Sequence, residues 1–263
     1  MLNILKEVLS VGFQFWWPVD LKYHYDTGGD WRVEVIVGAI LTQNTKWEIV
    51  EKSINKIKEH NLIFDIEEIN NTSEEKLLEL VKSVPFNLSK VKRIKTIVKH
   101  IIENFGSLDD FFSLETYELR KELLSIKGIG RETADVIILY SSEKPIFVVD
   151  NYTRKLLYDR GIIHRIGMDY DNIRIMFETF VKNNINELLN EFYSKLLNIN
   201  CMDSLKKAFN YDSNIKIFPP LNVCDLTRDL YYENKLVIIY KELHAIIDTY
   251  MKRNKNKKTK NLQ

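Results

Sequence analysis

Two glycines separated by one residue stand between two apolar segments, and this pattern has a chemical use. They are Gly128 and Gly130, within the stretch LLSIKGIGRETAD at residues 123–135. Glycine permits positive φ angles and lets another backbone approach closely. The amides of residues 128–131 are then exposed at a helix N-terminus, which carries partial positive charge and binds phosphate oxygens. Such a contact holds a nucleic-acid backbone without reading its sequence, although glycine is also common in purely structural helix turns.

Asp150 is the carboxylate whose position best suits catalysis. It follows the apolar run at residues 146–149 and precedes a segment with helical spacing that extends through Tyr158. An aspartate that opens a helix is usually an N-cap. A carboxylate at a helix N-terminus also stays ionised, as a base or a stabiliser of a cationic transition state requires. The two roles are compatible, so Asp150 is a candidate for both.

Trp16, Trp17 and Trp47 are three of the four tryptophans, a residue type whose indole ring can bind a flat or cationic ligand. A cation over an indole face gains about 0.5 to 2 kcal/mol, and stacking on a base adds to this. Each tryptophan has core packing as its alternative role, because its side chain buries a large apolar surface. Gln43, four residues before Trp47, is by itself an ordinary polar residue near a helix end.

The elements that must position these residues are predicted to be helices. The chain has 263 residues with only 9 glycines and 5 prolines, so long runs are uninterrupted and an all-α fold is expected. The run at residues 31–41 is apolar on most sides, and its length favours a buried helix over the strand that its β-branched residues alone would suggest. With it, ten segments are predicted to be helices: residues 31–41, 47–57, 73–84, 89–104, 117–126, 131–140, 150–158, 170–182, 185–197 and 226–250. Asn44 or Thr45 is expected to cap the second of them, and Pro85 to end the third.

The cysteine content and the apolar runs of the chain argue against a metal site, a secretory signal and a membrane span. The 38 basic and 37 acidic residues leave a net charge of +1, so bulk charge identifies no partner. The two cysteines, Cys201 and Cys224, are too few for a four-cysteine zinc or iron-sulfur site, so no metal is expected. Neither a secretory signal nor a long apolar span is evident, which predicts a cytoplasmic protein with no membrane partner. The basic residues 252–263 form a tail that is predicted to be disordered.

Three motifs in a fixed order resemble the helix-hairpin-helix (HhH-GPD) DNA glycosylase superfamily, the relatives of endonuclease III. They are LTQNTK at residues 41–46, the glycine-containing stretch at 123–135, and VVD at 148–150. The tryptophan-containing WWP at residues 16–18 is similar to a motif of the iron-sulfur-free 3-methyladenine DNA glycosylase III subfamily. The resemblance covers about residues 16–161, and residues 199–227 depart from the compact family pattern.

The resemblance implies roles for single residues at the base and sugar. Asp150 matches the family's catalytic aspartate, and Trp47 its stacking platform. Glu132 stands where bifunctional glycosylase/lyases have a lysine, and a carboxylate cannot form their Schiff base, so base removal without AP-lyase activity is implied. Glu132 either faces the base pocket or only begins a helix. The residues expected to line the pocket are Trp16, Trp17, Pro18, Trp47 and Glu132.

The resemblance also implies contacts with DNA. Gln43 matches the residue that fills the gap left by a flipped nucleotide. The residues expected to bind phosphate are Lys127, Gly128, Gly130, Arg131 and Thr133. For Lys127 and Arg131, solvated surface charge is the simpler alternative.

The resemblance implies an all-α fold of two lobes, with the active site in the cleft between them. The expected lobes are residues 31–144, which carry the hairpin, and residues 1–30 plus 145–251, which carry Asp150. The implied function is monofunctional base excision of an alkylated purine, such as 3-methyladenine, from double-stranded DNA. The protein is expected to be a monomer without cofactors, cytoplasmic or, in a prokaryote, associated with the nucleoid. The alternatives are an endonuclease III-like glycosylase or glycosylase/AP lyase for an oxidised pyrimidine or mispaired base, and a noncatalytic helix-hairpin-helix DNA-binding module.

Overall fold

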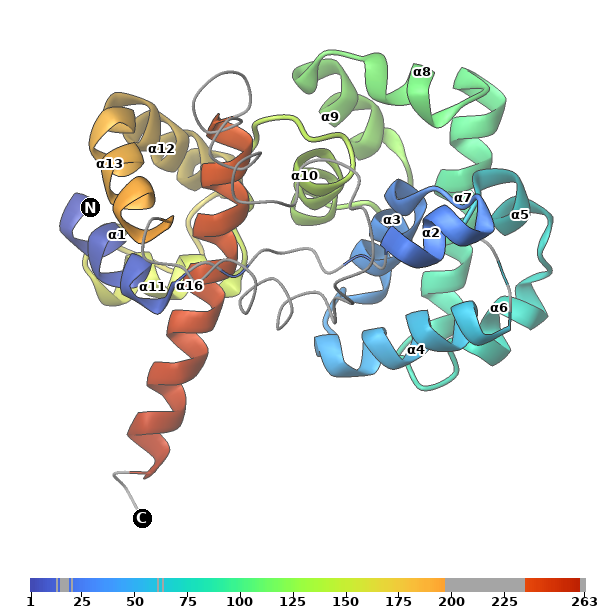
Figure 1. Ribbon diagram of the computed structural model, residues 1–263, viewed down its shortest axis with the longest axis horizontal. Helices are drawn as coiled ribbons and strands as arrows, with labels where there is room; N and C mark the ends of the chain where they lie inside the picture. Colours follow the sequence, from blue (N-terminus) through green and yellow to red (C-terminus); the bar gives the residue numbers. More distant parts are fainter. Residues whose placement is uncertain are drawn as a thin grey trace. The chain divides into compact units, whose positions relative to one another are not determined.

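The computed structural model describes residues 1–12, 14, 19, 21–60, 62, 64–196 and 235–260. The chain divides into two compact units, which Figure 1 shows as ribbons. Unit 1 comprises Met1–Pro18 and Pro145–Gln263, and unit 2 comprises Val19–Lys144. Throughout the described ranges, every regular element is helical, which confirms the all-α prediction. None of the helices in these ranges is both long and apolar enough to span a membrane.

Unit 2 is a bundle around two buried helices that lie far apart in the sequence. Its helices are α2 (Leu21–Thr27), α3 (Trp31–Leu41), α4 (Trp47–Glu59), α5 (Ile66–Asn71), α6 (Glu74–Leu80), α7 (Asn87–Phe105), α8 (Leu108–Ser113), α9 (Thr116–Ser125) and α10 (Arg131–Tyr140). Helix α3 packs against α4, α7 and α10, and α10 also packs against α9. Every residue from Val33 to Leu41 is buried. This explains why α3 is apolar on most sides rather than along one stripe.

Local sequence sets most of the helix ends in unit 2. The carboxylate of Asp30 accepts a hydrogen bond from the Arg32 amide and caps α3, and the Ser73 hydroxyl caps α6. Two predicted ends are wrong. Helix α4 begins after Lys46 with no side-chain cap, because the Thr45 hydroxyl instead bonds to Lys90 and to the Gln43 carbonyl. Helix α6 ends at Leu80, before the turns that lead to Pro85.

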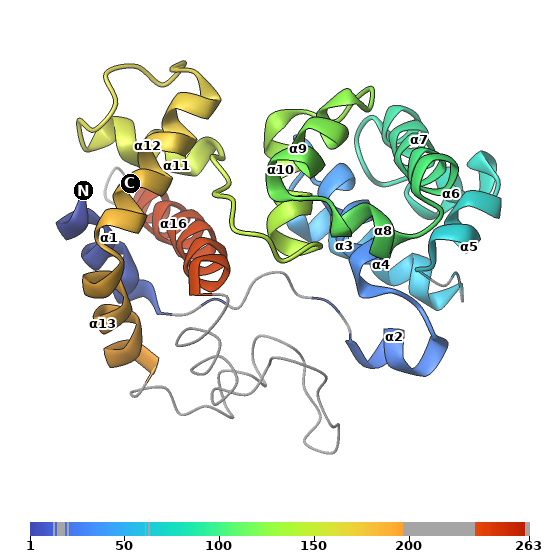
Figure 2. The ribbon, with the colours of Figure 1, turned by 90° about the horizontal axis from the view of Figure 1, so that it is seen from above.

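Unit 1 is organised by its C-terminal helix. It contains α1 (Leu2–Val8), the 3₁₀-helix η1 (Leu9–Val11), α11 (Asn151–Asp159), α12 (Tyr170–Asn183), α13 (Ile185–Leu196) and α16 (Lys235–Lys260). Helix α16 packs against α1, η1 and α11, and Figure 2 views the unit almost along the axis of α16. In the core, the rings of Phe147 and Phe177 stack with centroids 3.8 Å apart, and Tyr240 meets Phe147 edge-on at 5.7 Å.

Helix α16 differs from the sequence prediction at both of its ends. It begins at Lys235 rather than near Leu226, and it continues to Lys260 through the segment for which disorder was predicted. Residues 252–260 contain neither glycine nor proline, and lysine and arginine are good helix formers. The buried face at residues 237–251 nucleates the helix, so these basic residues only have to extend it.

Candidate functional site

The glycine-containing stretch forms a tight hairpin between α9 and α10 in unit 2. Gly128 has φ +95°, a conformation that favours glycine. Ile129 is 5% exposed and packs inward. Gly130 is the N-cap of α10 and makes no side-chain cap bond, while Lys127 and Arg131 on either side are exposed. The turn therefore presents basic side chains and a helix N-terminus of the kind that binds anions.

A buried ion pair fixes the two helices of the hairpin to each other. Arg120 on α9 donates from Nε to Oδ1 of Asp135 on α10 at 2.6 Å, and from Nη2 to Oδ2 at 3.3 Å. The side chain of Asp135 is 0% exposed and that of Arg120 is 11% exposed. A two-point contact between a planar guanidinium and a carboxylate restrains both distance and orientation. The hairpin is thus held by an electrostatic clamp as well as by apolar packing.

Gln43, the residue expected to enter the duplex, is attached to the hairpin. Its Nε2 donates to Oγ1 of Thr133 at 2.9 Å and approaches the Gly128 carbonyl at 3.4 Å. Arg93 on α7 donates to Oε1 of Gln43. The Thr133 side chain, expected to contact phosphate, is buried and accepts this bond from Gln43. The structure therefore brings Gln43 and the hairpin together.

Arg93 also explains why residue 128 has to be small. A Cβ atom built on Gly128 would lie 2.8 Å from both Cγ and Nε of Arg93. The arginine side chain therefore passes directly over the hairpin turn. It joins the turn to Gln43 because the same side chain bonds to the glutamine. Nothing in the sequence pattern identifies Arg93, since it is one of several basic residues on α7.

Lys90, one helical turn before Arg93, holds the segment between α3 and α4. Its Nζ donates to the Leu41 carbonyl at 2.8 Å and to Oγ1 of Thr45 at 2.6 Å. The residue is 1% exposed. Burial, with a smaller effect from the charge of Arg93, lowers the pKa of Lys90 to about 8. Lys90 thus caps the C-terminus of α3 and fixes the two ends of the turn that carries Gln43.

Phe86 is a second feature of this region that sequence reasoning missed. It is 76% exposed and has φ +55°, which is unusual for an aromatic residue. It forms the N-cap of α7, one turn before the lysine that holds the Gln43 turn. A solvent-exposed ring is suited to stacking on a base. The available signal was a phenylalanine directly after Pro85.

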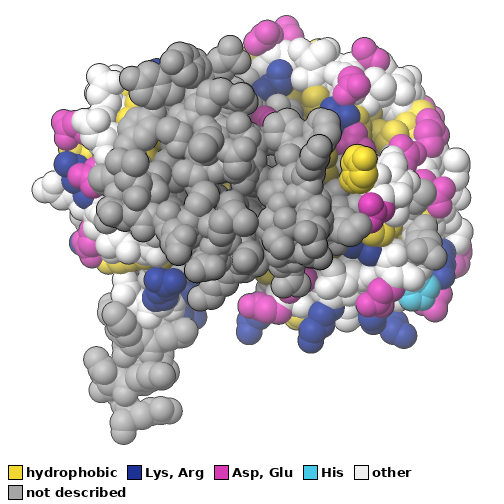
Figure 3. Space-filling model, viewed as in Figure 1, with side chains coloured by type: hydrophobic (Ala, Val, Ile, Leu, Met, Phe, Trp, Pro, Cys, Tyr) yellow, Lys and Arg dark blue, Asp and Glu magenta, His cyan; other side chains and the backbone are white. Residues whose placement is uncertain are grey.

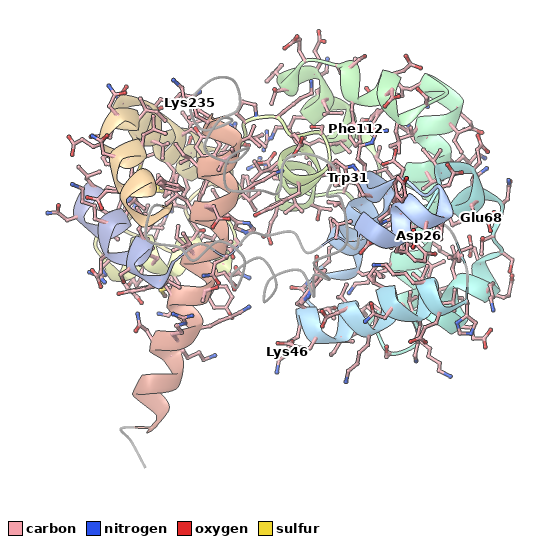
Figure 4. All side chains as sticks on the ribbon, viewed as in Figure 1. Asp26, Trp31, Lys46, Glu68, Phe112 and Lys235 are labelled. Carbon is pink, nitrogen blue, oxygen red and sulfur yellow. The ribbon has the colours of Figure 1, made fainter. Side chains whose placement is uncertain are left out.

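The other candidates of unit 2 lie at helix starts. Trp47 is the first residue of α4 and is partly exposed, and Lys46 before it points outward (Figure 4). Glu132 lies exposed in the first turn of α10, where an acid complements the helix dipole. On the described part of the face in Figure 3, basic and acidic side chains are interspersed. The described side chains visible on this face are therefore of mixed charge.

Asp150 in unit 1 is the N-cap of α11, as predicted. Its Oδ1 accepts a hydrogen bond from the Thr153 amide at 2.7 Å. Its Oδ2 lies 3.8 Å from Nε2 of His244 on α16, and the Asp150 side chain is 14% exposed. The carboxylate is therefore held rigidly at a helix N-terminus without being fully sealed from solvent.

A cluster of ionisable side chains on α16 continues from Asp150. His244, Asp248 and Lys252 follow one another at intervals of four residues, and the latter two form an ion pair at 2.8 Å. Burial lowers the pKa of His244, an effect that the charges of Asp150 and Asp248 oppose. Burial also raises the pKa of Asp248, against the hydrogen bond from Lys252. The four-residue spacing was the sequence signal for this cluster. It did not reveal that the cluster lies beside Asp150, the N-cap of α11.

Several predicted residues lie outside the described ones. They are Trp16, Trp17, Pro18 and the segment 199–227. Among the described residues, no group of three or more His, Cys, Asp or Glu side chains is arranged to hold a metal ion.

The chain matches known proteins at the level of both sequence and structure. Residues 37–182 match the family described as HhH-GPD superfamily base excision DNA repair protein. The chain is 38% identical over 209 residues to a Methanocaldococcus jannaschii protein named "Putative DNA repair glycosylase MJ1434", covering 79% of this chain and 89% of that protein. It is 26% identical over 122 residues to Thermotoga maritima endonuclease III, covering 46% and 53% of the two chains. It is also similar to the crystal structure of H. pylori 3-methyladenine DNA glycosylase (MagIII) bound to 1,N6-ethenoadenine, with a TM-score of 0.67, 27% identity and 96% of each chain covered.

Proposed function

Because the chain belongs to the HhH-GPD superfamily of base excision DNA repair proteins, and is therefore a DNA glycosylase, we propose that it removes an alkylated purine from double-stranded DNA. The observation that carries the proposal is the Asp150 carboxylate, fixed at the start of α11 and partly open to solvent. The similarity to a 3-methyladenine glycosylase over 96% of both chains supports 3-methyladenine as the substrate.

One carboxylate is sufficient for the chemistry of such a lesion. Alkylation of N3 or N7 places positive charge on the purine and weakens its bond to the sugar before the enzyme acts. As the bond from C1′ to the base nitrogen breaks, its electron pair goes to the base and positive charge develops on the sugar. A fixed carboxylate stabilises that charge and orients the water that attacks C1′. Asp150 would act in this way, with one oxygen anchored by the Thr153 amide.

We propose that the enzyme leaves the abasic strand intact. Strand cleavage by β-elimination requires an amine that forms a Schiff base with C1′. The position of the lysine in bifunctional relatives is occupied by Glu132, exposed in the first turn of α10. Lys90 has a lowered pKa, but it is buried and donates to the Leu41 carbonyl and to Thr45. Borohydride is therefore expected to trap no covalent complex, and a strong trapped adduct would contradict this part of the proposal.

The hairpin of unit 2 is the proposed binding site for the DNA backbone. Lys127 and Arg131 are exposed beside the N-terminus of α10, a combination suited to phosphate oxygens. Gln43 is attached to the same turn, through Thr133 and Arg93, where it could replace an extruded nucleotide in the stack. We propose that the enzyme acts as a monomer and needs no cofactor for this reaction.

The experiment is base release from methylated duplex DNA by the parent and by D150N. D150N should lose release of methylated purine while keeping its affinity for the duplex, because the amide side chain preserves the shape but not the charge. D159N is the matched control, since Asp159 ends the same helix, is exposed and pairs with Lys155. Retained release by D150N would contradict the catalytic role. No release by the parent on any lesion would favour the noncatalytic module.

A further inference from the structure

His244 lies beside the carboxylate proposed as catalytic, and it faces a particular oxygen. Its Nε2 is 3.8 Å from Oδ2 of Asp150, and the two side chains are 7% and 14% exposed. This distance is too long for a direct hydrogen bond and suits an ion pair or one bridging water. The other oxygen, Oδ1, accepts the Thr153 amide. His244 therefore faces the oxygen of Asp150 that does not serve as the helix cap.

The surroundings of His244 determine its charge. The ionisable groups that act on it are Asp150, which precedes α11, and Asp248 and Lys252 on its own helix. Asp248 is paired with Lys252 at 2.8 Å, and Lys252 also lies 5.5 Å from the ring centroid of Tyr152 on α11. Burial is the largest influence and lowers the pKa of His244. The imidazole is therefore neutral at neutral pH and able to accept a proton.

We propose that His244 is a positioning residue that controls the charge of Asp150 and receives the proton released by the attacking water. This inference rests on the proposed function of Asp150. A neutral imidazole leaves the carboxylate its full negative charge while the sugar becomes cationic. An imidazole protonated beforehand forms an ion pair with Oδ2, which weakens the stabilisation of the sugar cation.

The proton transfer balances without any further reactant. The bond from C1′ to the base nitrogen breaks, and its electron pair neutralises the cationic purine. Water adds to C1′, and the proton that it loses passes to Oδ2 of Asp150. From there the proton moves to Nε2 of His244, which accepts it in the tautomer that carries its hydrogen on Nδ1, directly after a small rotation or through one water. Asp150 is then an anion again and His244 an imidazolium, which returns its proton to solvent.

The first test is the pH dependence of single-turnover base release from methylated duplex DNA. Below neutral pH the parent should slow as His244 becomes protonated. H244Q keeps a polar nitrogen near the Nε2 position but cannot titrate, so its fall in rate should move to lower pH by about one unit or more. H164Q, at an exposed histidine of the same unit, should keep the parent profile.

The outcomes separate this inference from the proposed function. If the rate of base release by H244Q falls at the same pH as that of the parent, or is reduced by the same factor at every pH, the role of His244 is overturned but the proposed function is not. Absence of release by the parent at every pH would overturn the proposed function and this role with it.

The second test needs neither activity nor a stable His244 variant. NMR titration of the histidine ring signals in the parent and in D150N reports the coupling directly. Loss of the Asp150 charge should move the His244 titration to lower pH by about one unit or more, because a neighbouring anion favours the imidazolium. An unchanged His244 titration in D150N would overturn the proposal.

Discussion

Replacing Arg120 by methionine should strongly destabilise unit 2, because it removes the guanidinium that pairs with the buried carboxylate of Asp135. Asp135 is 0% exposed and receives hydrogen bonds of 2.6 and 3.3 Å from Arg120. Removing one partner of a buried pair costs about 3 to 5 kcal/mol. At about 4 °C per kcal/mol for a unit of this size, R120M should lower Tm by about 12 to 20 °C.

Calorimetry and urea unfolding of three variants test this reasoning. The double variant R120M/D135V removes both charges and should be more stable than R120M alone, since an apolar pair of similar volume usually replaces a buried ion pair without loss. K99M is the control for an exposed pair, because Lys99 and Glu103 are 65% and 59% exposed, and it should cost less than about 1 kcal/mol. An R120M variant that loses no more stability than K99M, or a double variant that is less stable than R120M, would contradict the stabilising role of the buried pair.

Three further predictions concern the hairpin, the Gln43 turn and the base pocket. G128V should weaken binding to any duplex, because residue 128 has φ +95° and the new Cβ would lie 2.8 Å from Arg93. The control G161V, where φ is +68° and no atom beyond the adjoining residues lies within 4 Å of the new Cβ, should lose stability but keep its DNA affinity. Equal affinities of the two variants in a DNA titration would contradict this prediction. The pKa of Lys90 is about 8 in the folded protein against about 10.4 in the unfolded chain. Between these pH values the unfolded chain binds more protons than the folded protein, so Lys90 makes the free energy of unfolding rise with pH. In urea unfolding at several pH values, K90M should therefore show a smaller rise than the parent. An equal rise in K90M and the parent would contradict the lowered pKa of Lys90. W47A should lose excision of a cationic purine by a larger factor than excision of an uncharged lesion in paired single-turnover assays, and equal factors would argue against charge recognition.

Most of the long helices were predictable from sequence because they show several turns of periodic apolar residues, whereas the uniformly apolar α3 was predictable from the length of its run. Helices α3 and α10 begin and end at the predicted residues. The short helices α1, α2, α5 and α8 were missed, since six or seven residues make less than two turns and display no clear period. The extension of α16 to Lys260 was missed because composition alone does not reveal that a buried helix precedes the basic residues.

The candidate site was predictable only where motifs are local. Asp150 as a helix cap and the hairpin glycines follow from a few consecutive residues. The residues that hold the site in place act across long stretches of sequence. Arg93 reaches both Gln43 and the hairpin, and His244 reaches Asp150 from the C-terminal helix. No sequence period encodes such tertiary pairs, so only the three-dimensional structure could identify them.

The most direct test of the account is a panel of duplexes, each containing one lesion, scored separately for released base and for strand scission. The panel contains an alkylated purine, an oxidised purine, an oxidised pyrimidine and a mispair. We expect release of the alkylated purine above all others, with the abasic strand left intact and with no release by D150N. Preferred release of an uncharged lesion, or strand scission in step with base release, would contradict a monofunctional enzyme that uses Asp150 to expel a cationic base.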